Sequence, residues 1–403
     1  MRAAAALFAL LVLAAPAAQA KARGLPAGSF ATYPDDFGNA LTAPDALRNF
    51  LASRPDVSTV VFQKGTHDLG ASPVFVFRRS GLTLCGATGR AEDVVLTTSS
   101  SVSLVLEQTG GIVLRDLTVR STATRGNAVR LNSVFSTDVE SFADDTRLEG
   151  CAFEAFIGIQ AAVRARNLTV TGSRCTVTQP GGAGLLWEDG TGLFVTRTRF
   201  NTTSNTATAA IFVDGAQSPT SQGDRARHIL LSRNTVTGDF ATGFDLADVT
   251  DADLRDNRIT FPGPQFATQT GLSGRVGIVI RRAAASALTE NYFLTRNSVR
   301  KAHYGLWLLN AGRGGVLANR FGACGSPVAD GRFGDTGGAM RLNLQSAVCN
   351  ISIQRNDFRG LASPSSAPAV GVLPAGNEGV CFGADDRNLV DRGRPLYLGA
   401  PTK

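Results

Sequence analysis

Residues 231–236 read Leu-Ser-Arg-Asn-Thr-Val, and residues 254–259 read Leu-Arg-Asp-Asn-Arg-Ile. Both segments place an asparagine three residues after one apolar residue and two residues before another. Asparagine suits a turn because its short polar side chain tolerates the left-handed backbone conformation. Repeated copies of one turn indicate a chain built from repeating units. The pattern returns at 294–299, 316–321 and 353–358, so that the asparagines are Asn234, Asn257, Asn297, Asn319 and Asn356.

A second pattern, a small residue followed by apolar-x-apolar, alternates strictly with the first. The shortest spacings between the two patterns, Leu104 to Leu117 and Cys151 to Ile159, give a bare repeat of about 22 residues. Upstream, degenerate copies of the first pattern put Leu117, Cys151, Cys175 and Thr198 in the asparagine position. The second pattern has its first apolar residue at Leu104, Val129, Ile159, Leu185, Ile211, Phe244, Ile278, Leu306 and Met340, with an earlier copy at Val74.

Apolar-x-apolar is the pattern of a short strand with one buried face. Such strands, joined by tight turns, form one coil, and stacked coils bury a continuous core. A leucine-rich repeat has a similar period, but it would need several leucines in each repeat, whereas valine, isoleucine, phenylalanine and alanine share these positions. The repeat resembles the right-handed parallel β-helix of the pectate lyase-like superfamily. The resemblance implies an all-β solenoid of about ten coils with an N-terminal capping helix.

The predicted organisation has four parts. Residues 1–20 resemble a secretory signal peptide, with a basic start, an apolar stretch and a small-residue cleavage site. Residues 21–57 form an N-terminal segment and cap, in which 43–54 are predicted to be helical. The parallel β-helix occupies residues 58–360, and residues 361–403 form a C-terminal cap or tail. The protein is therefore expected to be exported, to the periplasm or out of the cell.

The amino-acid composition is typical of strands and turns, and it limits the classes of binding partner. The 403 residues include 44 glycines, and 18% of the residues are charged. The formal net charge is +7, but the chain has no basic run, and export also argues against nucleic acid as a partner. After residue 20, no apolar run reaches the roughly 18 residues of a membrane span. We expect a monomer that binds a polysaccharide, and its positive charge would attract an anionic one.

Equivalent outward residues of successive coils stack about 4.8 Å apart in a β-helix. Two outward columns follow from the second pattern, and they bring carboxylates of three consecutive coils together. Like charges this close are costly on an ordinary strand surface, so the cluster is the best candidate site. Its carboxylates are Glu188, Asp189, Asp214, Asp245 and Asp248, and Arg281 and Arg282 lie on the next coil.

The resemblance implies polysaccharide β-elimination. Superfamily members of this kind hold Ca²⁺ with acidic residues on successive coils and remove a proton with an arginine. Ca²⁺ would be the cofactor, and Glu188, Asp214 and Asp248 would be its ligands. Arg281 or Arg282 would be the catalytic base. Lys301 would neutralise a substrate carboxylate, and the substrate would also contact His303, Tyr304 and Trp307.

Three alternatives remain open beside the lyase. Paired carboxylates, Glu188 with Asp214 or Asp214 with Asp245, would suit a glycoside hydrolase or transglycosylase. His303 with Tyr304 would suit a uronate epimerase. A non-catalytic β-helix could bind polysaccharide on Trp307, Tyr304 and Phe212. We predict an exported lyase that acts on a uronate-containing polysaccharide in a groove along one strand column, with these activities as alternatives. Inserted segments at 214–226, 261–276 and 322–338 would form the walls of this groove.

The asparagine position also predicts a disulfide. Cys151 and Cys175 would occupy this position on adjacent coils, where stacked residues lie within disulfide distance. Oxidation is compatible with an exported protein. Cys324 would have Cys349 or Cys381 as its partner.

Overall fold

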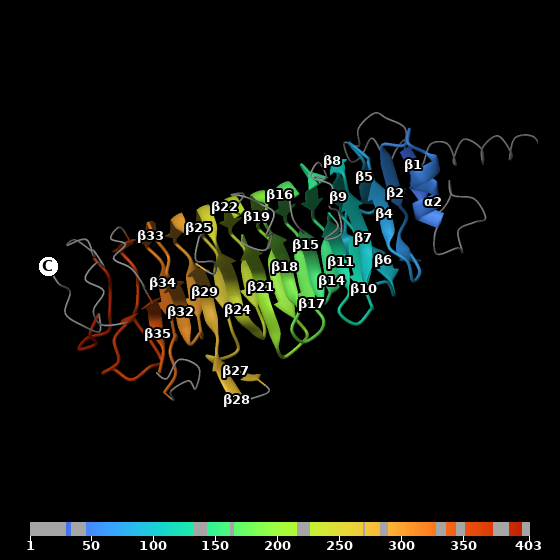
Figure 1. The fold of residues 1–403 in the computed structure, drawn as a ribbon. Coiled ribbons are helices and arrows are strands. Elements are labelled where there is room, and N and C mark those ends of the chain that lie inside the picture. The colour runs from blue at the N-terminus through green and yellow to red at the C-terminus, as the bar shows by residue number, and fades with distance from the viewer. Residues whose placement is uncertain are drawn as a thin grey trace, which may run out of the picture.

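The computed structural model describes residues 30–33, 46–132, 143–161, 165–215, 226–268, 271–282, 289–327, 336–343, 351–373 and 387–396. Strands dominate these residues and wind into a right-handed parallel β-helix (Figure 1). Within them there is one α-helix, α2 (Ala46–Ser53), and one short 3-10 helix, Ala91–Asp93. The predicted signal peptide, residues 1–20, lies outside the described residues.

Three parallel sheets, here called A, B and C, make up the walls of the β-helix. Sheet A contains β1 (Phe30–Tyr33), β2 (Thr59–Phe62), β5 (Thr83–Gly86), β9 (Val113–Arg115), β13 (Arg147–Glu149), β16 (Ala165–Thr171), β19 (Thr191–Thr196), β22 (Ala226–Ser232), β25 (Val249–Arg255), β30 (Glu290–Thr295), β33 (Gly314–Leu317) and β36 (Ile351–Gln354). The short strands β8 (Thr109–Gly110) and β12 (Ala143–Asp144) join it at one side.

Sheet B contains β3 (Gly65–Asp68), β6 (Val94–Thr98), β10 (Thr118–Ser121), β14 (Ala152–Ala155), β17 (Arg174–Val177), β20 (Arg199–Thr202), β23 (Thr235–Thr237), β26 (Arg258–Thr260), β31 (Ser298–Arg300) and β34 (Arg320–Gly322). Sheet C contains β4 (Val74–Phe77), β7 (Val102–Glu107), β11 (Asn127–Leu131), β15 (Ile157–Ala161), β18 (Ala183–Glu188), β21 (Ala207–Asp214), β24 (Phe240–Ala247), β29 (Val276–Arg281), β32 (Tyr304–Leu309), β35 (Gly338–Asn343) and β37 (Val370–Leu373). An antiparallel hairpin, β27 (Gln265–Thr268) and β28 (Gly271–Gly274), stands apart from the three sheets.

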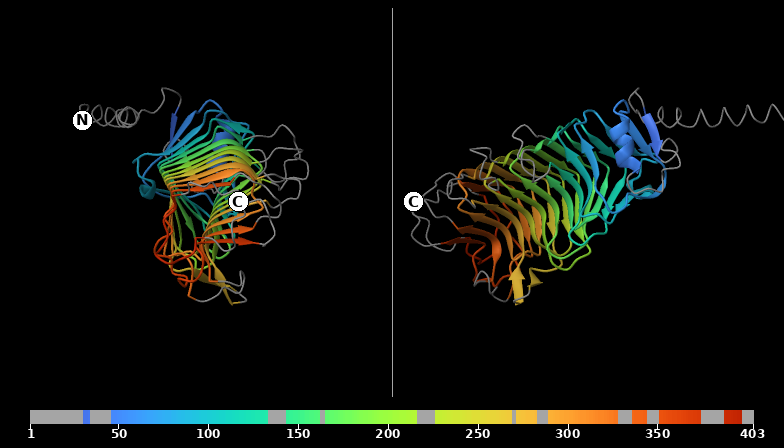
Figure 2. Two further views of the ribbon diagram at one scale, coloured as in Figure 1. Left: turned by 90° about the vertical axis from the view of Figure 1, so that its left-hand side faces the viewer. Right: turned by 45° about the vertical axis from the view of Figure 1, so that its right-hand side comes forward.

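Each coil runs from a strand of sheet C to one of sheet A and then to one of sheet B. The apolar-x-apolar pattern is the strand in sheet C, and the asparagine pattern spans the corner between sheets A and B. Because the three sheets enclose one core, the corner between A and B lies across the β-helix from sheet C. Figure 2 shows the stack of coils along its axis and from the side. Sheet C continues in β37, beyond the predicted end of the β-helix at residue 360.

The core fills the space between the three sheets. The inward positions of the strands are apolar and almost all fully buried, with Phe153, Phe200 and Trp187 among the largest side chains. Helix α2 lies at the N-terminal end of the stack and adds Leu47 and Leu51 to the same core (Figure 1). A helix was predicted there. None of the helices among the described residues is long and apolar enough to cross a membrane.

The small residues near the start of the sheet C strands make room for core side chains from sheet B. A Cβ atom at Gly184 would lie 2.5 Å from Cδ1 of Phe200 and 2.6 Å from the carbonyl oxygen of Ala210. Interiors packed to crystal density do not accept such an atom without movement. The small residue is therefore a packing requirement of the coil.

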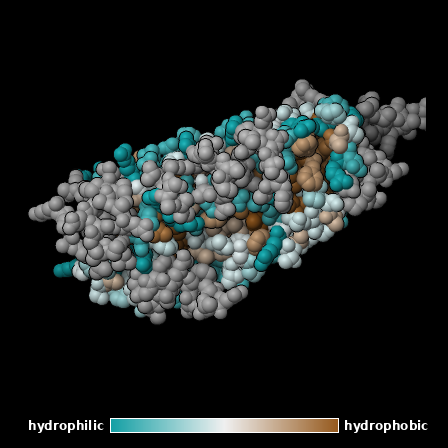
Figure 3. Space-filling model, in the orientation of Figure 1, coloured by the Kyte–Doolittle hydropathy of each residue, from teal (hydrophilic) through white to brown (hydrophobic). Residues whose placement is uncertain are grey.

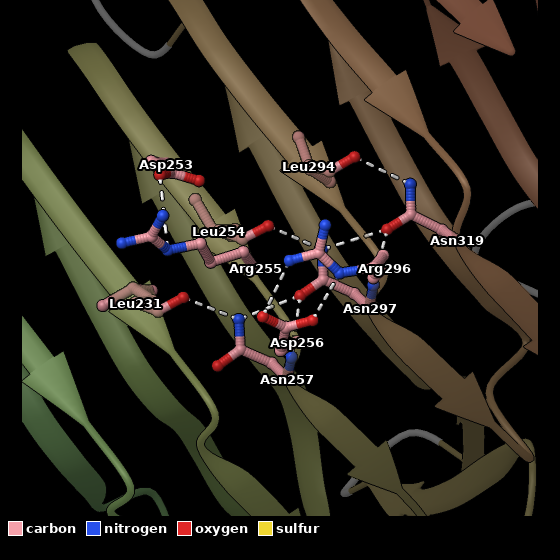
Figure 4. Close-up of polar contacts among 10 residues, drawn as sticks. All are labelled: Leu231, Asp253, Leu254, Arg255, Asp256, Asn257, Leu294, Arg296, Asn297 and Asn319. Carbon is pink, nitrogen blue, oxygen red and sulfur yellow. Dashed lines mark hydrogen bonds and ion pairs between the residues drawn. The ribbon is translucent and has the colours of Figure 1, made fainter.

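An asparagine ladder runs along the corner between sheets A and B (Figure 4). Asn257 is typical: its Nδ2 donates to the carbonyl oxygen of Leu231 at 2.8 Å and to Oδ1 of Asn297 at 2.9 Å. Its Oδ1 accepts from the backbone N and Nδ2 of Asn234 at 3.0 and 3.1 Å. Each side chain thus replaces backbone bonds lost at the turn. The ladder consists of Asn234, Asn257, Asn297, Asn319, Asn356 and Asn388.

The predicted disulfide between Cys151 and Cys175 is wrong, because both cysteines carry free, buried thiols in the structure. The reason is the register. Cys175 pairs with Phe153 on the neighbouring strand, two residues away from the expected position. Ser173 takes the ladder position instead, and its Oγ accepts from the backbone N of Cys151 at 3.1 Å. Burial raises the pKa of the Cys151 thiol to about 12, so it is an unreactive core residue. Cys349 and Cys381 lie outside the described residues.

Candidate functional site

The outer face of sheet C carries the candidate site, and its strand register agrees with the predicted columns. Glu188 pairs with Asp214, Asp214 with Ala247, and Ala247 with Arg281. In the neighbouring column, Phe212 pairs with Asp245. Where Figure 3 shows this face, apolar residues lie along its middle with hydrophilic residues beside them. Asp214 and Arg281 thus point from the same face, two coils apart.

Glu188 and Asp214 end two adjacent strands, β18 and β21. Their backbones are in register, which places them about 4.8 Å apart. Asp214 is only 9% exposed, and Glu188 is half-buried. Burial raises the pKa of the Glu188 carboxyl, and the charges of Asp214 and Asp189 act in the same direction. A carboxyl group of this kind keeps its proton to a higher pH than an exposed glutamate does.

Arg130 and Gln160 complete the surroundings of Glu188. They lie in the neighbouring outward column, on β11 and β15. The positive charge of Arg130 and a hydrogen bond from Gln160 partly offset the rise in the Glu188 pKa. Gln160 also accepts from Nδ2 of Asn127 at 2.6 Å, which holds its amide in place. Burial lowers the pKa of the Arg130 guanidinium, whose Nε is buried without a hydrogen-bond partner in the structure.

Sequence reasoning did not select Arg130 or Gln160 as site residues. Both appear in the first outward column, directly before the coils that carry the carboxylates. Their place in this column was therefore a usable signal, but the predicted cluster rested on negative charge alone. Residues that shift the pKa of a carboxyl group belong to the site as much as the carboxyl group does.

A second polar group lies further along the same face. Nε of Arg281 donates to Oδ1 of Asp245 at 2.8 Å, and both side chains are partly exposed. The Arg281 guanidinium carbon also lies 5.7 Å from the centre of the Phe212 ring. Asp245 and Arg281 were predicted as separate catalytic residues, and the structure joins them as an ion pair over an aromatic ring. Arg282 follows at the corner, where its backbone N donates to the carbonyl oxygen of Leu309.

The aromatic residues predicted to contact substrate differ in exposure. Trp307 lies in the first outward column, is partly exposed, and donates from Nε1 to Oδ1 of Asn343 at 3.1 Å. Tyr304 is only 4% exposed and packs with Val276 and Val279 in a small apolar cluster. The Arg341 guanidinium carbon lies 5.5 Å from its ring centre. Trp307 is therefore available to a ligand, whereas Tyr304 is covered.

Contrary to the prediction, neither His303 nor Lys301 lies on the outer face of sheet C. His303 is fully buried, its ring packs edge-on against Tyr304, and its backbone N donates to the carbonyl oxygen of Arg275. Lys301 is exposed but lies at the turn between β31 and β32, at the opposite end of the strand from Arg281. Proximity in sequence to the predicted groove was misleading, because the chain turns a corner between Lys301 and Tyr304.

The predicted calcium ligands Glu188, Asp214 and Asp248 are not gathered around a common point. Within the described ranges, no group of three or more histidine, cysteine, aspartate or glutamate side chains could hold a metal ion. Asp248 explains the difference. It lies at the corner after β24 with a left-handed backbone (φ 54°) and is fully buried. It therefore belongs to the turn and not to the outer face.

An insert flanks one end of the site. Residues 261–275, which include the β27–β28 hairpin, precede strand β29. Arg275 anchors this insert, because its buried guanidinium pairs with Asp239 and donates to the carbonyl oxygen of Gly263 at 2.7 Å. Two further predicted walls, formed by segments 214–226 and 322–338, lie partly outside the described residues.

No family model matches the sequence, and no curated protein matches it either. Solved structures do share the fold. A DFA-IIIase from Arthrobacter chlorophenolicus A6 in complex with GF2 superposes with a TM-score of 0.60 at 10% identity, over 94% of this chain and 100% of the other. The catalytic domain of a GH87 alpha-1,3-glucanase variant in complex with tetrasaccharides gives a TM-score of 0.52 at 10% identity, over 92% of this chain and 69% of the other.

Proposed function

We propose that the protein is a glycoside hydrolase or transglycosylase that cleaves a neutral oligosaccharide or polysaccharide on the outer face of sheet C. The observation that carries the proposal is the adjacent pair Glu188 and Asp214, in which burial raises the pKa of one carboxyl group. Glycoside cleavage requires a carboxyl group that can donate a proton and a second carboxyl group beside it. The two structural neighbours, described as a DFA-IIIase and an alpha-1,3-glucanase, support saccharide chemistry on this fold.

Glu188 is suited to be the general acid. Because its pKa is raised, its carboxyl group keeps a proton to a higher pH than an exposed glutamate does, and that proton can pass to the glycosidic oxygen as the bond to the anomeric carbon breaks. Asp214 would attack the anomeric carbon and form a glycosyl ester. Water, deprotonated by Glu188, would then release the sugar and regenerate Asp214.

The spacing supports retention of configuration. In-register neighbours in a parallel sheet lie about 4.8 Å apart, close to the ~5–5.5 Å between the carboxyl groups of retaining enzymes. Inverting enzymes need a wider gap to admit water. A retaining mechanism also permits transglycosylation, because a second sugar can replace water in the last step.

The ion pair of Arg281 and Asp245 supports a binding role rather than a base. Nε of Arg281 already donates to Oδ1 of Asp245, whereas the base of a β-elimination must accept a proton from the substrate. A charged Arg281 can instead donate to sugar hydroxyl groups. Trp307, three coils beyond Phe212, offers a ring on which a sugar can stack.

The first experiment is a screen of β-fructans, α-1,3-glucans and polyuronates with the purified protein. We expect new reducing ends or transfer products from a neutral substrate, with the anomer of the substrate retained in the first-formed product by NMR. An unsaturated product absorbing in the ultraviolet would contradict the proposal and support the lyase, with or without Ca²⁺.

Asp214→Asn tests the nucleophile directly. We expect this isosteric variant to lose activity by a factor of about 10² to 10⁴, and to regain turnover with azide, which replaces the missing carboxylate as nucleophile. Glu290→Gln, on sheet A, is the matched control and should keep the wild-type rate. An Asp214→Asn variant as active as the control would overturn the assignment.

A further inference from the structure

A row of arginines follows the corner between sheets A and B. These arginines occupy the residue directly before the asparagine-ladder position, where the backbone is left-handed, with φ between 40° and 57°. The strand registers on either side place them in one column, from coil to coil. The column has arginine at Arg197, Arg233, Arg296, Arg355 and Arg387.

A second arginine column runs beside the first, two residues further along each coil. Its members begin strands of sheet B and pair with one another through intervening Thr235 and Ser298. We call the two columns together the basic ridge. The second column has arginine at Arg174, Arg199, Arg258 and Arg320.

The basic ridge is strongly positive. All nine of its arginines are exposed. The same two columns hold two aspartates over these coils, and each is bonded to an arginine. Both carboxylate oxygens of Asp256 accept hydrogen bonds from the guanidinium of Arg296, at 2.7 and 3.0 Å (Figure 4). Asp357 accepts from Arg359 in the same way.

The backbone does not explain why arginine stands at this corner. A left-handed conformation favours glycine, asparagine and aspartate. The same column has Asp116, Gly150 and Gly172 in the earlier coils, all with positive φ. Five arginines in the later coils therefore occupy sites where they are conformationally disfavoured. Their charge is the property that these positions share.

We propose that the basic ridge binds a linear anionic polysaccharide, independently of the proposed activity of sheet C. Arginine forks bind carboxylate and sulfate groups through two parallel hydrogen bonds. The columns place guanidinium groups at multiples of about 4.8 Å along a straight line of roughly 34 Å over eight coils. A polyuronate chain also carries its carboxylates at short, regular intervals.

Nucleic acid fits this surface less well. Single-stranded nucleic acids are held by aromatic side chains on which the bases stack, beside the positive charges. Within the described coils, neither column of the basic ridge contains an aromatic residue. A polyanion without bases needs only the charges.

The position of the basic ridge gives the binding a geometric consequence. The ridge lies across the β-helix from sheet C. A polymer bound there would leave the face with Glu188 and Asp214 directed away from it. The protein could thus be held on an acidic matrix while another chain enters the candidate site.

The test compares two pairs of substitutions with equal loss of charge. Arg233→Asn with Arg355→Asn removes two ridge charges, and asparagine keeps the left-handed backbone. Arg78→Asn with Arg125→Asn is the matched control, because both arginines are exposed, have φ of 50° and 58°, and lie at other corners. Affinity for soluble alginate is measured at 50 and 200 mM NaCl.

We expect the wild type to bind alginate with an affinity that falls steeply with salt. The ridge pair should weaken binding about threefold to tenfold more than the control pair, since exposed ion pairs are individually weak. Both pairs should cleave the neutral substrate at the wild-type rate, so failure here leaves the proposed function untouched. Three results would each overturn the proposal. The first is an equal loss of alginate affinity in both pairs, and the second is no alginate binding by the wild type. The third is tighter binding of DNA or of anionic lipid vesicles than of alginate.

Discussion

The corner between sheets A and B and the outer face of sheet C use the same coil in opposite ways. At the corner, one asparagine is repeated from Asn234 to Asn388, and each interior copy makes the same hydrogen bonds. On the face, the residue changes with every coil: Glu188 is followed by Asp214, Ala247 and Arg281. Repetition therefore marks what holds the coils together, and variation marks where chemistry is added.

The largest expected effect is on activity at Glu188. Glu188→Gln should lower kcat/KM by a factor of about 10² to 10⁴, because the proton donor is lost. In the wild type, activity should fall as the pH rises through the pKa of Glu188, and this fall should come at a higher pH than for an exposed glutamate. The variant cannot titrate there, and the alkaline limb of its pH–rate profile should disappear. An unchanged limb in Glu188→Gln would assign the proton donor to another residue.

A substitution in the ladder should change the free energy of unfolding rather than the activity. Asn297→Ala removes bonds from Nδ2 to Leu254 and Asn319 and leaves the buried backbone N of Asn257 without its acceptor. We expect unfolding to require about 3 kcal/mol less free energy, measured by denaturant titration. Exposed Asn205→Ala is the control and should change stability by less than about 0.5 kcal/mol. Equal stability of the two variants would mean that the ladder contributes little.

Gly184→Ala should have an intermediate effect through overpacking. The added methyl group would collide with Phe200 and with the backbone of the next coil, which costs about 1–3 kcal/mol. Gly172→Ala is a useful comparison, because its position (φ 60°) has no atom within 4 Å of an added Cβ. That variant should lose only about 1 kcal/mol from backbone strain. Thermal unfolding of both proteins would separate packing from strain, and a larger loss at Gly172 would contradict this view.

The smallest effect is expected where the ladder stops. Thr198 is the next position upstream of Asn234: its backbone N donates to Oδ1 of Asn234, and its Oγ1 donates to the carbonyl oxygen of Thr196. Thr198→Asn should extend the ladder by one position upstream and raise stability by up to about 1 kcal/mol. A lower melting temperature would show that the earlier coils are too tightly packed for the larger side chain.

The sequence predicted the fold and the columns of sheet C because its small-apolar-x-apolar pattern sets both strand and register. The pairing of Glu188 with Asp214 follows directly from it. Upstream of Asn234 the corner pattern loses its asparagine, and Cys175 was aligned two residues out of register for that reason. A turn without its asparagine does not show which of its residues occupies the ladder position.

The parts of the site that could not be predicted depend on burial. His303 and Asp248 stand beside the outer face in sequence, but both side chains are fully buried at corners. The pKa of Glu188 is raised by burial and by the charges of Asp214 and Asp189, and Arg130, two coils away, offsets part of that rise. Pattern analysis assigns a residue to a face, whereas its proton affinity depends on everything that covers it.

The ladder also has a consequence for how the molecule folds. Asn297 bonds to Leu254 in the coil before it and to Asn319 in the coil after it, so each interior amide ties three coils together. A single coil cannot form these bonds, whereas a coil added to an existing stack forms them at once. Growth by addition to a nucleus is therefore favoured, and unfolding should begin at the ends, where the amides have a neighbour on one side alone.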